Sequence, residues 1–372
     1  MESAKASGRT LQNITNTTIF VVLIGWLLVI GKSLLIPIIV ALILVYILAA
    51  LDHQLGVLPV VRVLPAWLRR VVLLLIFLAM FAGFAALIVV TVQELVTQAP
   101  HYQANLEILF GELTRLVGVE RMPDWATIRQ TLLGQIDIQA WLSSAASQLS
   151  SIGGMLFLVL VYLSFLFGEK AEFASKLEAA FPDPARAQQT RGLIGAINER
   201  VGQYLGTKTL INVILGVISY VIMAAFGLDY AAFWALLIGL LNYIPYIGSI
   251  VGLLFPVALS IVQFASWPQT LGLYAALQIA QIVVGNFLEP KMVGRKVNLS
   301  PFVVLVALSF WSAVWGITGA ILAVPLTSIL AIIFNEIPAT RPLAVLMSDD
   351  VGVFRKVFLR GRSRTSSGSA KP

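Results

Sequence analysis

Residues 231–264 read AAFWALLIGLLNYIPYIGSIVGLLFPVALSIVQF and decide the fold of this chain. The run is too long for one bilayer crossing, which takes about 20 mostly apolar residues. Pro245, Gly248 and Gly252 interrupt it near its centre. Because proline and glycine inside an apolar run mark breaks or re-entrant turns, the stretch predicts two helices joined by a tight turn.

A second long run, residues 301–337, has a similar interruption. Gly316 and Gly319 stand at its centre, and Pro325 follows Gly316 by nine residues. In the first run Pro256 follows Gly248 by eight residues. The two runs therefore predict two helical hairpins of related design.

The composition places the chain in a membrane. Of its 372 residues, 59% are hydrophobic and only 12% are charged, with a mean hydropathy of +0.91. A soluble domain is about 45–50% apolar and about 25% charged. These values exclude soluble enzymes, nucleic-acid binders and disordered scaffolds as first interpretations, so the net charge of +7 is read as basic loops beside the bilayer and not as a nucleic-acid surface.

Other apolar runs extend this interpretation along the chain. Six of them predict spanning helices, at residues 14–30, 34–51, 71–92, 152–167, 209–226 and 271–288. The first is read as a retained span, because no small-residue cleavage site follows it. The fold class expected is an all-α integral membrane protein, multi-span and helical, with two re-entrant helical hairpins.

Basic residues predict the orientation. Twenty-one of the 25 Lys and Arg residues fall in five segments: 1–11, 52–70, 169–208, 289–300 and 338–372. Placing these segments in the cytoplasm puts both termini inside. It also makes the first two runs a hairpin that turns at Gly31-Lys32-Ser33. The run 231–264 then starts and ends outside and 301–337 starts and ends inside, which is an inverted repeat; the alternative is that each run crosses twice.

These assignments divide the chain into consecutive segments. They are a cytoplasmic tail (1–11), scaffold spans (12–92), an extracytoplasmic amphipathic segment (93–150), a span (151–168), cytoplasmic amphipathic helices (169–204), a transport unit (205–338) with hairpins 231–264 and 301–337, and a basic cytoplasmic tail (339–372).

Polar residues inside apolar runs are costly in hydrocarbon unless they face protein or a cavity. At a helical step of 100°, one stripe on 271–288 comprises Gln278, Gln281, Gly285, Asn286 and Glu289, and another on 209–226 comprises Lys208, Asn212, Gly216 and Ser219. The expected substrate pathway adds residues at the two breaks: Asn242, Tyr243, Pro245, Gly248, Ser249, Trp315, Gly316, Thr318 and Gly319.

Two roles remain open for this set. Single hydroxyls are explained by hydrogen bonds between helices, whereas convergent stripes beside broken hairpins are typical of a transport site. Lys208, Glu289 and Lys291 form either a structural ion pair or a coupling site for H⁺ or Na⁺. Metal and other cofactors are not expected, because the chain has no Cys and only two His. No nucleophile–base pair suggests an enzyme.

Several blocks resemble the autoinducer-2 exporter family of bacterial membrane proteins. They are Tyr204–Lys208 (YLGTK), 233–237 (FWALL), 242–249 (NYIPYIGS), 285–294 (GNFLEPKMVG), 299–301 (LSP) and 315–327 (WGITGAILAVPLT). The pattern of spans extends the resemblance over about residues 12–350. The two longest blocks are the most specific.

The resemblance implies a bacterial inner-membrane permease that forms a homo-oligomer, for which a pentamer is one candidate. Some family members are assigned to export of autoinducer-2 and others to sodium(lithium)/proton antiport. The function expected is therefore secondary transport or facilitated export of a small polar solute by alternating access. Cation/proton antiport is one alternative, and a non-transporting membrane scaffold or regulator acting through residues 93–150 is another.

Overall fold

The computed structural model describes residues 2–55, 65–117, 153–166, 183–293 and 298–350, and single residues 169, 176, 179 and 180. Within these residues the regular structure is helical throughout, without a strand. Six of the helices are long and apolar enough to cross a membrane. The protein is an all-α membrane protein, as its composition predicts.

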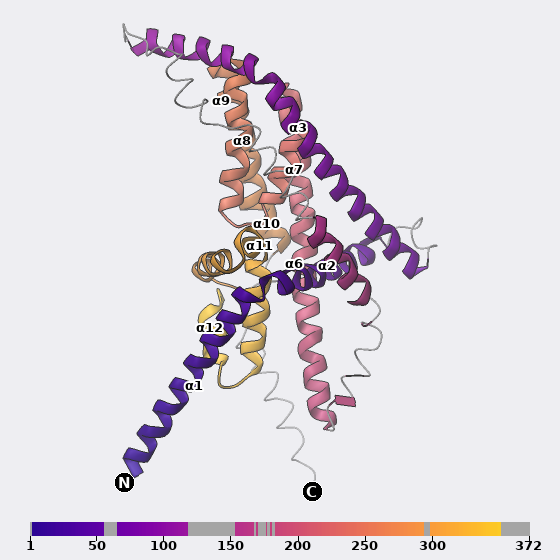
Figure 1. Cartoon of the computed structure of the whole chain (residues 1–372), viewed down its shortest axis with the longest axis vertical. Helices are drawn as coiled ribbons and strands as arrows, with labels where there is room; N and C mark the ends of the chain where they lie inside the picture. The colour runs from indigo at the N-terminus through magenta and orange to yellow at the C-terminus, as the bar shows by residue number, and fades with distance from the viewer. Residues whose placement is uncertain are drawn as a thin grey trace.

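Figure 1 labels the helices in chain order. They are α1 (Glu2–Ile30), α2 (Lys32–Leu55), α3 (Ala66–Val117), a helix at Gly153–Leu166, α6 (Pro184–Ala225), α7 (Ala231–Leu241), α8 (Ile247–Phe264), α9 (Trp267–Ile282), η1 (Val283–Leu288), α10 (Glu289–Val293), α11 (Pro301–Glu336) and α12 (Arg341–Met347).

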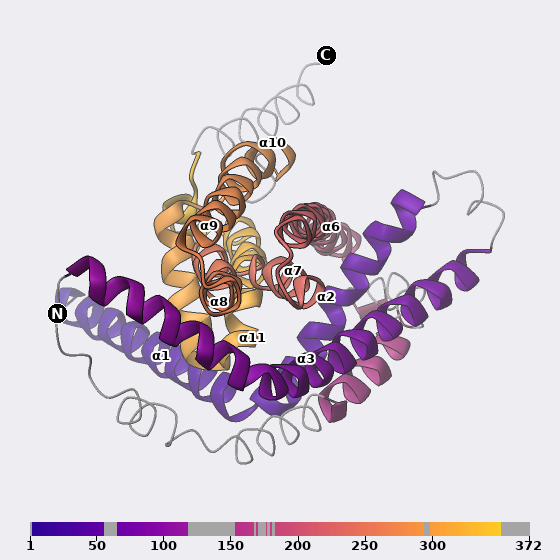
Figure 2. The same ribbon diagram turned by 90° about the horizontal axis from the view of Figure 1, so that it is seen from above.

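Helices α6 to α9 share the largest apolar core. It includes Ile211 and Leu215 of α6, Ile238 of α7, Leu253 of α8 and Leu277 of α9, all buried. Figure 2 shows α3 crossing outside this bundle. Large side chains facing away from the core stay exposed, with 64% of Phe20 and 75% of Phe165 accessible. Such surfaces are suited to lipid and not to water.

Helix α2 packs on both sides. Its Ala41 and Leu48 pack with Leu73 of α3 and Leu163 of the helix Gly153–Leu166. The opposite face, which includes Ile43, packs with α6 and α11. The two apolar faces explain why α2 is almost uniformly hydrophobic. Helix α2 thus connects the peripheral helices to the bundle.

The junction of α1 and α2 corrects one expectation. Residues flanking Gly31-Lys32-Ser33 were expected to form a hairpin, but the chain bends there and does not reverse. The Gly31 N–H donates to the Leu27 carbonyl at 2.8 Å, and the Leu35 N–H donates to the Gly31 carbonyl at 2.8 Å. These are helical i to i−4 bonds, so they carry the helix through the bend. Figure 1 shows α2 running across the direction of α6.

Two helices extend well past the predicted spans. Helix α3 continues beyond residue 92 to Val117, with Pro100 inside it. Helix α6 starts at Pro184, where the Asp183 carboxylate accepts a hydrogen bond from the Ala185 N–H at 3.0 Å as an N-cap. The segment boundaries expected near residues 93 and 205 therefore fall inside continuous helices.

Candidate functional site

The interruption of 231–264 is a sharp turn between α7 and α8. Tyr246 has a φ of +62°, which side chains rarely adopt. A Cβ added to Gly248 would lie 1.9 Å from the Leu241 carbonyl oxygen. Only glycine allows two backbones to approach so closely. Helices α7 and α8, the two arms of the first hairpin, are thus joined at the break that Pro245 and Gly248 predict.

Helix α6 holds this turn through two side-chain hydrogen bonds. Asn242 Nδ2 donates to Asn212 Oδ1 at 2.8 Å. The Tyr243 hydroxyl lies 2.6 Å from Thr209 Oγ1. Thr209 donates its own proton to the Leu205 carbonyl at 2.7 Å, so Tyr243 is the donor in the shared bond. Residues 209 and 212 lie on one face of α6 because they are three apart, and together they orient the turn.

Close packing of α6 on α7 places these groups. A Cβ on Gly216 would lie 3.3 Å from the Ala235 carbonyl oxygen, and one on Gly239 would lie 3.0 Å from the Asn212 carbonyl oxygen. Small residues at such contacts let helix backbones approach. Because Asn242 follows Gly239 by three residues, the contact brings its side chain against Asn212.

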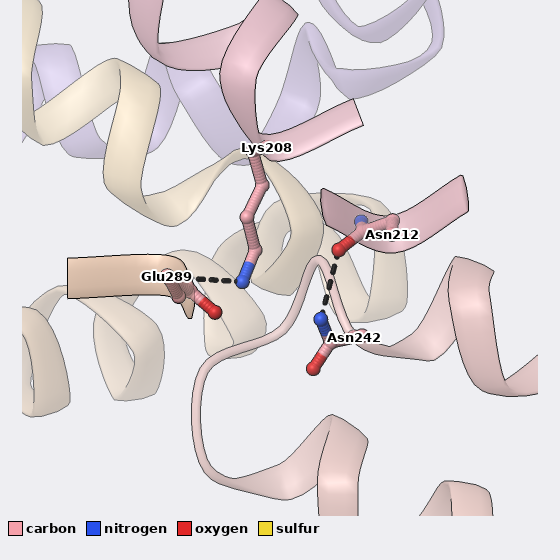
Figure 3. A network of polar contacts seen from close by, with 4 residues as sticks. All are labelled: Lys208, Asn212, Asn242 and Glu289. Atoms are coloured by element: carbon pink, nitrogen blue, oxygen red, sulfur yellow. Dashed lines mark hydrogen bonds and ion pairs between the residues drawn. The ribbon is translucent and has the colours of Figure 1, made fainter. Parts of the chain in front are cut away.

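An ion pair lies next to the turn. Lys208 Nζ contacts Glu289 Oε1 at 2.5 Å, and the Lys208 side chain is only 4% exposed, against 29% for Glu289. Figure 3 shows this pair beside the Asn212–Asn242 hydrogen bond, with Lys208 and Asn212 projecting from α6. Lysine is almost never fully buried unless paired. The partner of Glu289 is thus Lys208, whereas Lys291, the neighbour suggested by the sequence, is exposed.

A π-helix, η1, positions Glu289. Its wider turns invalidate the constant 100° step that placed Gln278, Gln281, Gly285, Asn286 and Glu289 on one stripe. Gln281 is buried, with 8% exposed, and Asn286 is exposed. The stripe is therefore split: Glu289 reaches α6, while Asn286 faces away from the core.

The second hairpin is contained in α11. Gly316 has φ +63° and ψ −142°, which ends the first arm. A Cβ on Gly319 would lie 1.9 Å from the Trp311 carbonyl oxygen. Residues eight apart in a straight helix are separated by about 12 Å, so the chain folds back at Gly316. Trp311 Nε1 donates to Thr327 Oγ1 at 3.1 Å and joins the two arms.

The two hairpins meet at Ile244. This residue lies in the turn between α7 and α8, is 6% exposed, and belongs to one buried cluster with Trp311, Trp315, Ala320 and Ala323 of α11. The two breaks, 70 positions apart when counted from Tyr246 to Gly316, are thereby brought into one region.

The structure separates the expected site residues into three groups. The group around the first turn comprises Lys208, Asn212, Asn242, Tyr243, Pro245, Gly248 and Glu289. The group at the second break comprises Trp315, Gly316 and Gly319, and the remaining residues form the third group. Ser219 and Gln281 are buried on α6 and α9, Gln278, Ser249 and Thr318 are partly buried, and Asn286 and Lys291 are exposed.

Three residues of this region were not expected from the sequence: Thr209, Gly239 and Ile244. Each is an ordinary residue of an apolar segment, and its role depends on a partner distant in sequence. Gly239 did carry a signal, because it is a small residue three positions before Asn242. In the part of the chain that the structure describes, His, Asp and Glu residues form no group that could hold a metal ion.

Comparison with known proteins places this architecture among transporters. A sequence profile of the AI-2E family transporters matches residues 17–339. The AI-2 transport protein TqsA of Escherichia coli is 29% identical over 341 residues, covering 88% of this chain and 95% of that protein. A protein of Haemophilus influenzae, provisionally named as a transport protein, is 30% identical and covers 77% of this chain and 83% of its own length.

Proposed function

Because the chain belongs to the AI-2E family of transporters, we propose that it is a secondary transporter or facilitated exporter of a small polar solute. It works by alternating access in a bacterial inner membrane, as a homo-oligomer. Membership of the family makes it a multi-pass membrane transporter, and the solute, the mechanism and the assembly are the proposal.

One observation carries this proposal: two broken hairpins meet at Ile244 beside a buried polar set. In transporters with interrupted helices, such turns supply backbone groups that bind the solute. Helix α7 has 11 residues and rises only about 16 Å, too little to cross a hydrocarbon core of about 30 Å. Its shortness supports a re-entrant first hairpin.

The orientation proposed has both termini in the cytoplasm. Figure 1 places the start of α1 and the start of α6 at the same end of the molecule. The first half of α6 carries Arg186, Arg191 and Arg200, and basic residues near a span favour the cytoplasmic side. The bend at Gly31 removes the hairpin that accompanied this orientation in the charge count, so the proposal depends on the basic residues and on the position of the start of α6. Cysteine labelling of the naturally Cys-free chain from each side of the membrane tests it.

The solute we propose is autoinducer-2. The relative TqsA is named for AI-2 transport and aligns over most of both chains. The groups around the first turn include neutral amides and hydroxyls, from Asn212, Asn242, Tyr243 and Thr209. Such groups suit a neutral polyol, whose hydroxyls both donate and accept hydrogen bonds.

Release of autoinducer-2 from proteoliposomes tests the function. Wild-type protein is compared with Asn242→Ala, which removes the bond between the turn and α6, and with Gly316→Leu, which is strained at a φ of +63°. Ser164→Ala is the control, because this exposed serine bonds only its own helix at the Leu160 carbonyl. Each protein is assayed with no gradient, a proton gradient or a sodium gradient.

We expect release by the wild type and Ser164→Ala, with loss in both hairpin variants. The gradient that accelerates release identifies the coupling ion. Equal release from all four proteins rules out the hairpins as the transport site. Absence of release above empty liposomes, with folded wild-type protein in the membrane, overturns the solute.

Cation/proton antiport is the second candidate. The Lys208–Glu289 pair favours it, since ionisable side chains at membrane depth mark ion pathways and π-helical segments are frequent at functional sites. This candidate predicts that Glu289→Gln abolishes sodium-dependent proton movement in proteoliposomes, whereas Asn286→Asp, at an exposed position of η1, retains it.

A further inference from the structure

The far end of α3 is joined to two loops of the helical bundle by polar contacts. One loop connects α6 to α7 and includes Gly227 and Asp229; the other connects α8 to α9 and follows Gln263. Figure 1 shows α3 passing over the ends of α8 and α9. None of these contacts involves the candidate site at Asn242, so they form a separate feature.

Gln263 connects the two loops to each other. Its Nε2 donates to the Gly227 carbonyl at 2.8 Å, and its Oε1 accepts from the Asp229 N–H at 2.8 Å. Both ends of the amide are therefore used. This side chain therefore ties the end of α8 to the loop that follows α6.

Helix α3 contacts that body at two neighbouring residues. The Tyr102 hydroxyl donates to Asp229 Oδ2 at 3.2 Å. Asn105 Nδ2 donates to the carbonyl oxygens of Val262 and Gln263, at 2.9 and 3.1 Å. Tyr102 and Asn105 are three residues apart and share a helix face, so these three hydrogen bonds come from one face of α3.

Pro100 lies just before this face. Proline has no N–H to donate to the carbonyl four residues earlier, and its ring disfavours a straight helix. Figure 1 shows α3 changing direction over the bundle, in its final third. We assign this change of direction to Pro100, which precedes Tyr102 by two residues.

We propose that α3 beyond Pro100 is a latch over this end of the bundle, held shut by Tyr102 and Asn105 and released during transport. The inference rests on the proposed function, because alternating access requires each end of the transport unit to open in turn. Helix α8 forms one arm of the first hairpin. When α8 moves, the carbonyls of Val262 and Gln263 must separate from Asn105, so the latch must open.

The chemistry of the contact suits a reversible latch. Side-chain hydrogen bonds exchange for bonds to water when the two surfaces separate, so their net contribution to stability is modest. Tyr102 contributes more than a hydrogen bond. Its side chain is 8% exposed and packs in the core of the bundle, which stabilises the closed latch relative to the open one.

Two introduced cysteines measure the latch without background labelling, since the natural chain has none. Ala104→Cys with Ser266→Cys places one label beyond Pro100 and one in the α8–α9 loop. The control pair is Gln93→Cys with Ser266→Cys, whose first label precedes the bend. Distances between spin labels are recorded in liposomes with and without autoinducer-2 and with each ion gradient.

We expect the 104–266 pair to show two distances whose populations change with solute or gradient, and the 93–266 pair to change less. Adding Tyr102→Phe and Asn105→Leu should raise the population of the longer distance several-fold. A single distance for 104–266 in every condition, unchanged by these two substitutions, overturns the latch.

A cleavable cross-linker between residues 104 and 266 tests whether transport requires the latch to open. Cross-linking should stop autoinducer-2 release, and cleavage should restore it. Undiminished release from fully cross-linked protein also overturns the latch. If the uncross-linked protein releases no solute, the proposed function fails, while the distance measurement still decides the latch by itself.

Discussion

The indole Nε1 of Trp315 donates a hydrogen bond to the backbone carbonyl of Leu28 at 2.9 Å, across 287 positions of sequence. Trp315 is the last residue before the reversal at Gly316, and Leu28 lies in the last turn of α1, three residues before the bend at Gly31. The tip of the second hairpin is therefore tied to the bend of the N-terminal helices. Leu35 and Ile36 of α2 pack around the same cluster.

Trp315→Phe should loosen this junction. Phenylalanine keeps an aromatic ring but loses the donor, and the expected cost is about 1 kcal/mol in the free energy of unfolding. Hydrogen exchange of the backbone amides near Gly31 should accelerate. Trp311→Phe is the matched control, because Trp311 donates to Thr327 within α11. Equal acceleration near Gly31 in both variants contradicts a specific tie between Trp315 and α1.

The closest backbone approach in the first hairpin gives a second prediction. A Cβ at position 248 would lie 1.9 Å from the Leu241 carbonyl oxygen, whereas a Cβ at position 252 would lie 3.5 Å from Ile238 Cα, an ordinary contact. Gly248→Ala should cost about 3 kcal/mol, at the upper end for an overpacked site, and Gly252→Ala about 0.5 kcal/mol or less. Thermal unfolding in detergent compares the two, and similar midpoints would argue against a tight turn.

The positions of both turns could be predicted from the sequence because the causes are local. Gly316 stands where the chain needs a positive φ, and Gly248 stands where two backbones touch. Proline and glycine carry that information in the residue type itself. The same reasoning identified Asn242 as a residue beside a break, and the structure places it there.

The errors have a different origin. Charge counting predicted a hairpin at Gly31 because it placed the basic segments 1–11 and 52–70 on one side of the membrane. The helical bonds through Gly31, which contradict that hairpin, are visible only in the structure. A constant helical step assigned Asn286 to the same face as Gln281, and the π-helix removes that relation. The ion pair of Glu289 joins residues 81 positions apart, which no local pattern reports.

The Lys208–Glu289 pair predicts an asymmetric response to mutation. Glu289→Gln leaves the buried Lys208 ammonium without its partner, which costs about 3–5 kcal/mol for an uncompensated buried charge. Lys208→Met should cost less, because the Glu289 side chain is 29% exposed and can be hydrated. Unfolding free energies in detergent measure both variants.

The double variant Lys208→Met with Glu289→Gln completes the cycle. It should recover most of the stability lost in Glu289→Gln, because no unpaired charge remains. Equal losses in the two single variants, adding without recovery in the double variant, contradict an interaction between the two side chains.

Tyr102 predicts a loss of stability at alkaline pH. Burial raises the pKa of the Tyr102 phenol above its ordinary value of 10.0, and its neighbours Tyr230 and Asp229 raise it further. The folded protein therefore keeps a proton that the unfolded chain releases above pH 10. By linkage, the stability from this group is complete below pH 10 and falls as the pH rises beyond it.

Comparison with Tyr102→Phe isolates the effect. Phenylalanine cannot ionise and loses the hydrogen bond to Asp229, so the variant should be less stable than the wild type at about pH 8 and closer to it at about pH 10.5, where an unfolded tyrosine is mostly ionised. Burial also raises the pKa of Tyr230, and its hydrogen bond with Tyr102 lowers it, so the same comparison is repeated in a Tyr230→Phe background. Thermal midpoints at the two pH values provide the measurement. A stability difference that stays constant between them would show that the Tyr102 phenol does not titrate differently in the folded and unfolded states.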